Sequence, residues 1–145
     1  MAGSAGGMDR RGFIARVSVI GASALLTRCG GDPSSVALPV TNGSVTLTFT
    51  EFPVLAQPGG GVVVQVQGGS PILVVRHETG AVAMTAVCTH EGCTVGFDPT
   101  TLGAACPCHG SQYDSEGHVT RGPAPLPLEL FAATLEAEGI KVTIG

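Results

Sequence analysis

Runs of apolar residues divide the chain after residue 36 into short stretches that are typical of β-strands. Segment 45–50 alternates apolar and polar residues with a period of two, as a half-buried strand does. Segments 62–67 and 72–76 are rich in β-branched residues, and the Gly-Gly-Ser-Pro sequence between them predicts a hairpin. Further strands are expected at 82–87, 126–131 and 140–144. No convincing helical pattern follows residue 30.

The composition agrees with a small β-domain. The 145 residues include 22 Gly and 10 Pro, and only 12% are charged, which favours a loop-rich β-protein over a helical one. We therefore predict an all-β fold, a small antiparallel β-sandwich with an inserted subdomain of loops. The expected organisation is a signal or anchor over residues 1–30, a linker over 31–35 and one domain over 36–145.

The first thirty residues have the features of an export signal. Segment Asp9–Ile14 resembles a twin-arginine signal, and the apolar run 17–26 contains an A-x-A cleavage site at Ala22–Ala24. This predicts export to the periplasmic side of the cytoplasmic membrane. Three fates stay open: cleavage, lipidation at Cys29, or retention as an anchor, for which the run is shorter than the usual ~20 residues. The start residue is open between Met1 and Met8.

Two short boxes of cysteine and histidine carry the candidate chemistry. They are 88–93 (Cys-Thr-His-Glu-Gly-Cys) and 106–111 (Cys-Pro-Cys-His-Gly-Ser). Each box supplies one thiolate and one imidazole at close spacing, and the candidate metal ligands are Cys88, His90, Cys106 and His109. Two thiolates and two imidazoles are the ligand set of a Rieske [2Fe–2S] centre. Glycine tolerates positive φ and favours such loops, and the relevant glycines are Gly92, Gly96, Gly103 and Gly110.

The remaining cysteines of the boxes are Cys93 and Cys108. If both loops close over one cluster, these two residues are placed to form a disulfide, which requires an oxidising compartment. Two alternatives use the same residues. One is a tetrahedral zinc site, although zinc ribbons usually contain two Cys-x₂₋₄-Cys pairs. The other is two disulfides among the four cysteines, with the histidines idle.

Mixed ligands predict a high reduction potential that is linked to proton uptake. Two neutral imidazoles leave a cluster less negative than four thiolates would, so adding an electron costs less, and potentials of roughly −150 to +300 mV result. Binding to ferric iron makes an imidazole N–H more acidic, so the electron and the proton are taken up together. His90 and His109 are therefore the candidate catalytic residues.

The boxes resemble those of the Rieske proteins of cytochrome bc and bf complexes, and the match is best to the bf type. The resemblance covers residues 84–132 and includes a proline-rich third loop, Arg-Gly-Pro-Ala-Pro-Leu, at 121–126. It implies that Ser111 donates its hydroxyl to a bridging sulfide and that Tyr113 donates its phenol to a ligand thiolate. Both donors would stabilise the reduced state and raise the potential.

The resemblance implies a high-potential electron-transfer protein rather than an enzyme that acts alone. It would be the iron–sulfur subunit of a quinol:cytochrome c or plastocyanin-type oxidoreductase, with a cytochrome b-type membrane subunit, a c-type cytochrome or similar acceptor, and a quinol as partners. Residues 36–145 contain nine acidic and three basic residues, a net charge of −6 with His neutral. That charge excludes nucleic acid and favours a basic redox partner.

One residue departs from the family pattern. Glu91 follows the first ligand histidine, where the family usually carries a leucine that docks against the quinol pocket. A carboxylate at an apolar docking face costs desolvation unless it is paired. Glu91 therefore favours the alternative function, a stand-alone periplasmic electron carrier or the small subunit of a molybdenum oxidase such as arsenite oxidase.

Overall fold

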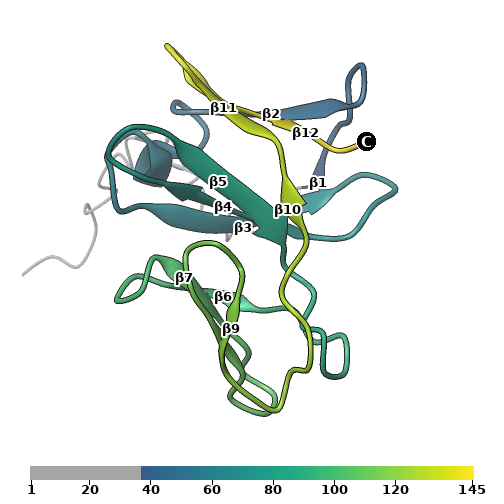
Figure 1. Cartoon of the computed structure of the whole chain (residues 1–145). Helices are drawn as coiled ribbons and strands as arrows, with labels where there is room; N and C mark the ends of the chain where they lie inside the picture. Colours follow the sequence, from purple (N-terminus) through teal and green to yellow (C-terminus); the bar gives the residue numbers. More distant parts are fainter. Residues whose placement is uncertain (1–36) are drawn as a thin grey trace, which may run out of the picture.

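The computed structural model describes residues 37–145. The expectations for the export signal, the linker and Cys29 lie outside the described residues. Twelve strands form three sheets (Figure 1). Their bounds are β1 Ala37–Leu38, β2 Ser44–Thr48, β3 Gly61–Val66, β4 Ile72–Arg76, β5 Ala81–Thr85, β6 Gly96–Asp98, β7 Gly103–Ala105, β8 Gln112–Tyr113, β9 Val119–Arg121, β10 Leu130–Phe131, β11 Ala133–Glu136 and β12 Gly139–Thr143.

The largest sheet has the order β1-β3-β4-β5-β10, and a second sheet has the order β11-β12-β2. All pairs in them are antiparallel except β1 with β3. The alternation predicted for β2 is present: Val45 and Leu47 are fully buried, while Thr46 between them is exposed. Their side chains pack with Ile140 and Val142 of β12 against one face of the larger sheet. The antiparallel sandwich is thus confirmed.

Strand β4 lies in the middle of the larger sheet and is buried on both faces. Its residues Ile72 and Val74 belong to the core shared with the β2 sheet, whereas Leu73 and Val75 belong to a second core on the opposite face. Successive side chains of a strand point to opposite faces, so a strand covered on both sides has no polar position. This explains why 72–75 is continuously apolar instead of alternating.

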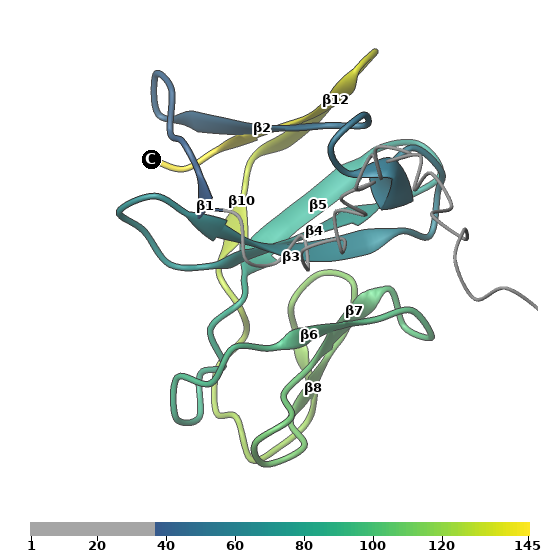
Figure 2. The ribbon, with the colours of Figure 1, turned by 180° about the vertical axis from the view of Figure 1, so that it is seen from behind.

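The second core lies under a third sheet, of order β6-β7-β8-β9, which carries the two boxes. Both views place this sheet and its loops below the large sheet and away from the β11–β12 hairpin (Figures 1 and 2). At the junction, the Phe97 ring of β6 lies where a side chain on Gly61 of β3 would stand. Only glycine at 61 lets the ring pack this closely.

The inserted subdomain is therefore built on a sheet as well as on loops. Gly96 and Gly103, expected in loops, are strand residues of β6 and β7. Only Leu130–Phe131 of the strand expected at 126–131 pairs with β5. A single short 3-10 turn, Pro53–Leu55, is the one helical segment in the described part. No helix in residues 37–145 is long and apolar enough to cross a membrane.

Candidate metal centre

The first box forms a tight loop between β5 and β6. The Cys88 amide donates to the Cys93 carbonyl at 2.8 Å, and the Gly92 amide donates to the Cys88 carbonyl at 2.9 Å. Gly92 has a φ of 74°, a conformation that glycine adopts without the strain of a side chain. Two backbone hydrogen bonds and a left-handed glycine thus close the loop tightly.

The second box repeats this geometry between β7 and β8. The Cys106 amide donates to the Ser111 carbonyl at 2.8 Å, and the Gly110 amide donates to the Cys106 carbonyl at 3.0 Å. Gly110 has a φ of 76°. The two loops therefore have the same hydrogen-bond pattern, with the left-handed glycine four residues after the first cysteine in each.

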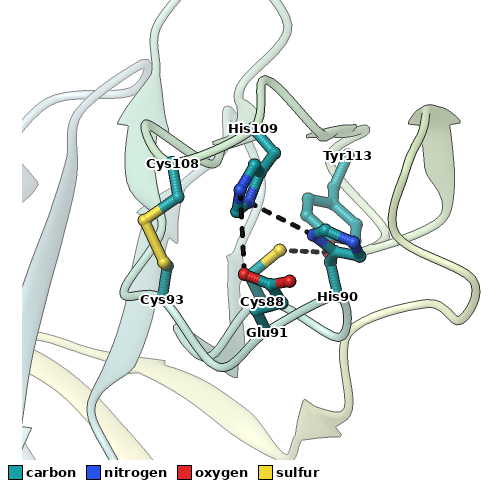
Figure 3. The surroundings of a disulfide bond; sticks show 7 residues. All are labelled: Cys88, His90, Glu91, Cys93, Cys108, His109 and Tyr113. Atoms are coloured by element: carbon teal, nitrogen blue, oxygen red, sulfur yellow. Dashed lines mark hydrogen bonds and ion pairs between the residues drawn. A yellow bond between two sulfur atoms is a disulfide. The ribbon is translucent and has the colours of Figure 1, made fainter.

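A disulfide joins the two loops, between Cys93 and Cys108 (Figure 3). Cys108 is exposed and Cys93 is half-buried, so the bond lies at the rim of the site. The predicted disulfide is present. The alternative of two disulfides is wrong, because Cys88 and Cys106 are free and buried. The sulfurs of Cys93, Cys106 and Cys108 all lie within 4.8 Å of one another.

The two imidazoles point toward each other across the loops (Figure 3). His90 Nδ1 lies 3.2 Å from His109 Nδ1, with the rings nearly perpendicular at 87°. Two nitrogens bound to one metal at ~2.1 Å in a tetrahedral arrangement are about 3.4 Å apart. The spacing therefore suits two ligands of a single metal ion, with the opposite Nε2 edges left toward the outside.

The two free thiols lie deeper than the imidazoles. Cys88 and Cys106 are 2% and 3% exposed, while the His109 side chain is 45% exposed. Burial raises the pKa of the Cys88 thiol, but hydrogen bonds from the Tyr113 hydroxyl and the His90 backbone outweigh it, so this pKa is below its ordinary value. A lowered pKa favours the thiolate, the form that binds iron.

The donor set fits a two-metal cluster better than a single zinc ion. Four ligands of one tetrahedral zinc must all lie within about 4 Å of one another. Among the described residues, no group of three or more donors within 4.8 Å of one another contains both a histidine and a cysteine: one group is His90, Glu91 and His109, and the other is Cys106 with the bridged Cys93 and Cys108. Nitrogen donors at one end and sulfur donors at the other match the two irons of a mixed-ligand [2Fe–2S] cluster.

Tyr113 of β8 reaches under the first box. Its hydroxyl lies 3.3 Å from Cys88 Sγ and accepts a hydrogen bond from the Thr89 amide at 3.3 Å. Burial raises the pKa of Tyr113, and its interaction with Cys88 raises it further, so the phenol keeps its proton. Because the Thr89 amide already supplies one proton to this oxygen, the phenol proton is free to point at the cysteine sulfur.

Ser111 connects the second box to the proline-rich loop. It is fully buried, and its Oγ accepts the amide of Ala124 at 3.0 Å. A hydroxyl that accepts one hydrogen bond still has its own proton to donate. The Ser111 hydroxyl therefore keeps a proton to donate, and its hydrogen bond to Cys88 contributes to the lowered pKa of that thiol.

Thr89 connects the first box to the same loop, a role that no sequence pattern indicated. Its Oγ1 donates to the Leu126 carbonyl at 2.7 Å and accepts the Leu126 amide at 3.4 Å. The proline-rich loop is thus held to one box at Ala124 and to the other at Leu126. A single threonine forms no sequence motif that would predict these hydrogen bonds.

Comparison with known proteins agrees with this geometry. Residues 54–132 match the family model of the Rieske [2Fe-2S] domain. The chain belongs to this family. Its fold and its donor set are those of a Rieske domain, so the cofactor is one [2Fe–2S] cluster.

Several relatives have known assemblies. The cytochrome b6-f complex iron-sulfur subunit of Prochlorococcus marinus (strain MIT 9301) is 39% identical over 99 residues, 66% of this chain and 56% of that protein. The corresponding subunit of Chlorobaculum tepidum is 30% identical over 137 residues, 94% of this chain and 76% of that protein. The chain thus spans little more than half the length of the first of these relatives.

A solved structure is also similar. The plasma membrane Rieske protein PetC3 from Synechocystis PCC 6803 superposes with a TM-score of 0.55 at 27% identity, covering 68% of this chain and 97% of that one. This similarity agrees with the Rieske fold expected from the sequence.

The disulfide of the Rieske domain generates a prediction. The double replacement Cys93→Ala, Cys108→Ala removes a link between residues 15 apart in sequence, and a loop of this size contributes about 3 kcal/mol. We expect a lower melting temperature in thermal unfolding of the cluster-loaded protein, followed by circular dichroism. Treating the unaltered protein with a disulfide reductant should give the same shift when the variant is measured in the same reductant, so that the cluster is reduced in both samples. An unchanged melting temperature in both samples would contradict the prediction.

Proposed function

We propose that this protein is a high-potential electron-transfer subunit of a quinol:cytochrome c or plastocyanin-type oxidoreductase. The observation that carries the proposal is the convergence of the His90 and His109 Nδ1 atoms, 3.2 Å apart, at the outer end of a site that contains two buried free thiols. The cytochrome b6-f subunits of Prochlorococcus and Chlorobaculum support it.

Four side chains hold the cluster in this proposal. Cys88 and Cys106 would hold it as thiolates, and His90 and His109 would hold it through Nδ1. When bound, the cluster supplies a one-electron redox change. The protein's part is to hold the loops at fixed separation through the Cys93–Cys108 disulfide and to keep water from the thiolates, which are nearly fully buried.

Ser111 and Tyr113 tune the potential. The hydroxyl of Ser111 would donate to a sulfide of the bound cluster, and the hydroxyl of Tyr113, 3.3 Å from Cys88 Sγ, would donate to that thiolate. Hydrogen bonds to sulfur stabilise the more negative, reduced state. The buried position of both residues protects these bonds from competition with water.

Nε2 of His90 and His109 is the ring nitrogen opposite the metal-facing Nδ1, and it would be without a proton when the bound cluster is oxidised. His109 Nε2 is on the exposed edge, 3.7 Å from a Glu91 carboxylate oxygen, where a quinol hydroxyl could approach it. The deprotonated imidazole would accept the quinol proton there when the cluster takes up the electron. The quinol proton and its electron thus arrive at the same exposed edge.

The N-terminal sequence indicates where in the cell the protein acts. Segment Asp9–Ile14 directs twin-arginine export of the folded, cluster-loaded protein. The domain then faces the periplasm, where the disulfide is stable, anchored by its N-terminus or peripheral to the membrane. A cytochrome b-type subunit and a c-type cytochrome or similar acceptor are its partners.

A second function is favoured by one observation. The Glu91 side chain is 60% exposed at the edge of the site, and burying it in an apolar quinol pocket would cost free energy. A periplasmic electron carrier, or the small subunit of a molybdenum oxidase such as arsenite oxidase, has no such pocket to enter.

Purification from native membranes separates these functions. We expect the affinity-tagged full chain to co-purify with b-type haem, seen in the difference spectrum, and to show the EPR signal of a reduced mixed-ligand cluster. Co-purification with molybdenum, or recovery as a lone protein from the periplasmic fraction, would overturn the proposal in favour of the second function.

The proposed proton-holding role predicts a pH-dependent potential. An imidazole that loses its proton in the oxidised state stabilises that state, so the potential should fall as the pH rises above neutrality. Protein-film voltammetry of the full chain between about pH 6 and pH 10 measures this. A potential that stays flat across that range would exclude the coupling while leaving the cluster assignment intact.

The donor roles predict lower potentials in two variants. Removing one hydrogen bond to sulfur, in Ser111→Ala or Tyr113→Phe, should lower the potential by about 40–60 mV, since ~1 kcal/mol corresponds to about 43 mV for one electron. Ser115→Ala in the β8–β9 turn removes a hydroxyl from the same sheet and should leave the potential unchanged. Equal potentials in all three variants and the unaltered protein would refute the donor roles.

A further inference from the structure

Glu91 occupies the exposed edge of the site without a cationic partner of its own. Its carboxylate lies 3.7 Å from His109 Nε2, and its side chain is 60% exposed (Figure 3). Within residues 37–145, the ion pairs of 4.0 Å or less involve only histidines, and none joins a carboxylate to Lys or Arg. The Glu91 charge is thus available to a group from another molecule.

The neighbouring surface combines this charge with apolar contact area. Leu126 is 62% exposed and is held by its backbone to Thr89, two residues before Glu91 in the first box. An exposed leucine held in place can be covered by a partner with little loss of freedom. A surface of this kind fits a partner whose own contact is apolar with a cation at its edge.

The chemistry of a carboxylate decides what kind of partner fits. Covering Glu91 with an apolar surface removes the water bound to its carboxylate and supplies no hydrogen bond in place of it. Covering it with a lysine or arginine replaces the lost water with a charge-assisted hydrogen bond. The net charge of −6 over residues 36–145 adds a long-range attraction for a cationic partner.

We propose that Glu91 is the docking contact for a cationic one-electron acceptor, a protein with Lys or Arg beside its exposed haem edge. In the complex the cation would pair with the Glu91 carboxylate, and one electron would pass from the reduced cluster, on the side of His109, to the ferric haem. The cluster would be oxidised, the haem would become ferrous, and a proton taken up by the imidazole on reduction would return to solvent. The inference rests on the proposed electron-transfer function but not on assembly with a particular membrane complex.

Acceptors of opposite charge test the proposal. The cluster-loaded full chain, reduced beforehand, is mixed in a stopped-flow instrument with a lysine-rich cytochrome c or with ferricyanide. The variants are Glu91→Gln and, as the matched control, Glu138→Gln. Glu138 lies in the exposed β11–β12 turn away from the boxes (Figure 1), so both variants change the net charge equally.

We expect Glu91→Gln to lower the ratio of the cytochrome rate to the ferricyanide rate about two- to fivefold at low ionic strength, the range of one exposed charge pair. Any change in cluster potential affects both acceptors alike and leaves the ratio unaffected. The salt dependence of the cytochrome rate should also become weaker, whereas Glu138→Gln should behave as the unaltered protein does.

Binding of redox-inactive zinc-substituted cytochrome c, measured by calorimetry, gives a readout that is independent of electron transfer. Glu91→Gln should weaken this binding about two- to fivefold relative to Glu138→Gln. Equal rate ratios and equal affinities in the two variants would overturn the docking role and leave the proposed function standing. A wild-type cluster that reduces neither acceptor would instead refute the proposed function, while the zinc protein still reports on docking.

Discussion

The separation of the two histidine nitrogens is the constraint on which this structure depends. His90 and His109 are 19 residues apart in sequence and come from different loops, yet their Nδ1 atoms lie 3.2 Å apart. No single loop can hold that distance. It is held by a disulfide at the rim, by matching backbone turns in both boxes, and by a third loop that is hydrogen-bonded to each.

The large sheet supplies the rigid support for these loops. Its strand β4 directs Ile72 and Val74 into one core and Leu73 and Val75 into the other, so the sandwich and the subdomain pack on opposite faces of the same sheet. The close contact between Gly61 and Phe97 fixes β6 against this sheet. Sites built on packed strands are held more closely than sites on loops alone.

Sequence patterns predicted many of these elements, for reasons that differ from one element to the next. The alternation around Val45 and the apolar run 72–75 are long enough to indicate strands, and the boxes have distinctive spacing. Strands β6 to β9 have two or three residues each, too few for any periodicity to show. Segment 126–131 is apolar because Leu128 fills the second core, not because the whole segment pairs as a strand. The hydrogen bonds between Thr89 and Leu126 join residues that are far apart in sequence, so no local pattern indicates them.

The close grouping of three sulfurs has a practical consequence for anyone who alters the disulfide. Cys106 Sγ lies within 4.8 Å of both bridged sulfurs. Replacing Cys93 or Cys108 alone therefore leaves an odd thiol beside Cys106, and the two can oxidise to a new bridge in the same compartment. Such a variant would lose a proposed iron ligand through mispairing, whereas removing both cysteines together leaves no thiol from the broken disulfide beside Cys106.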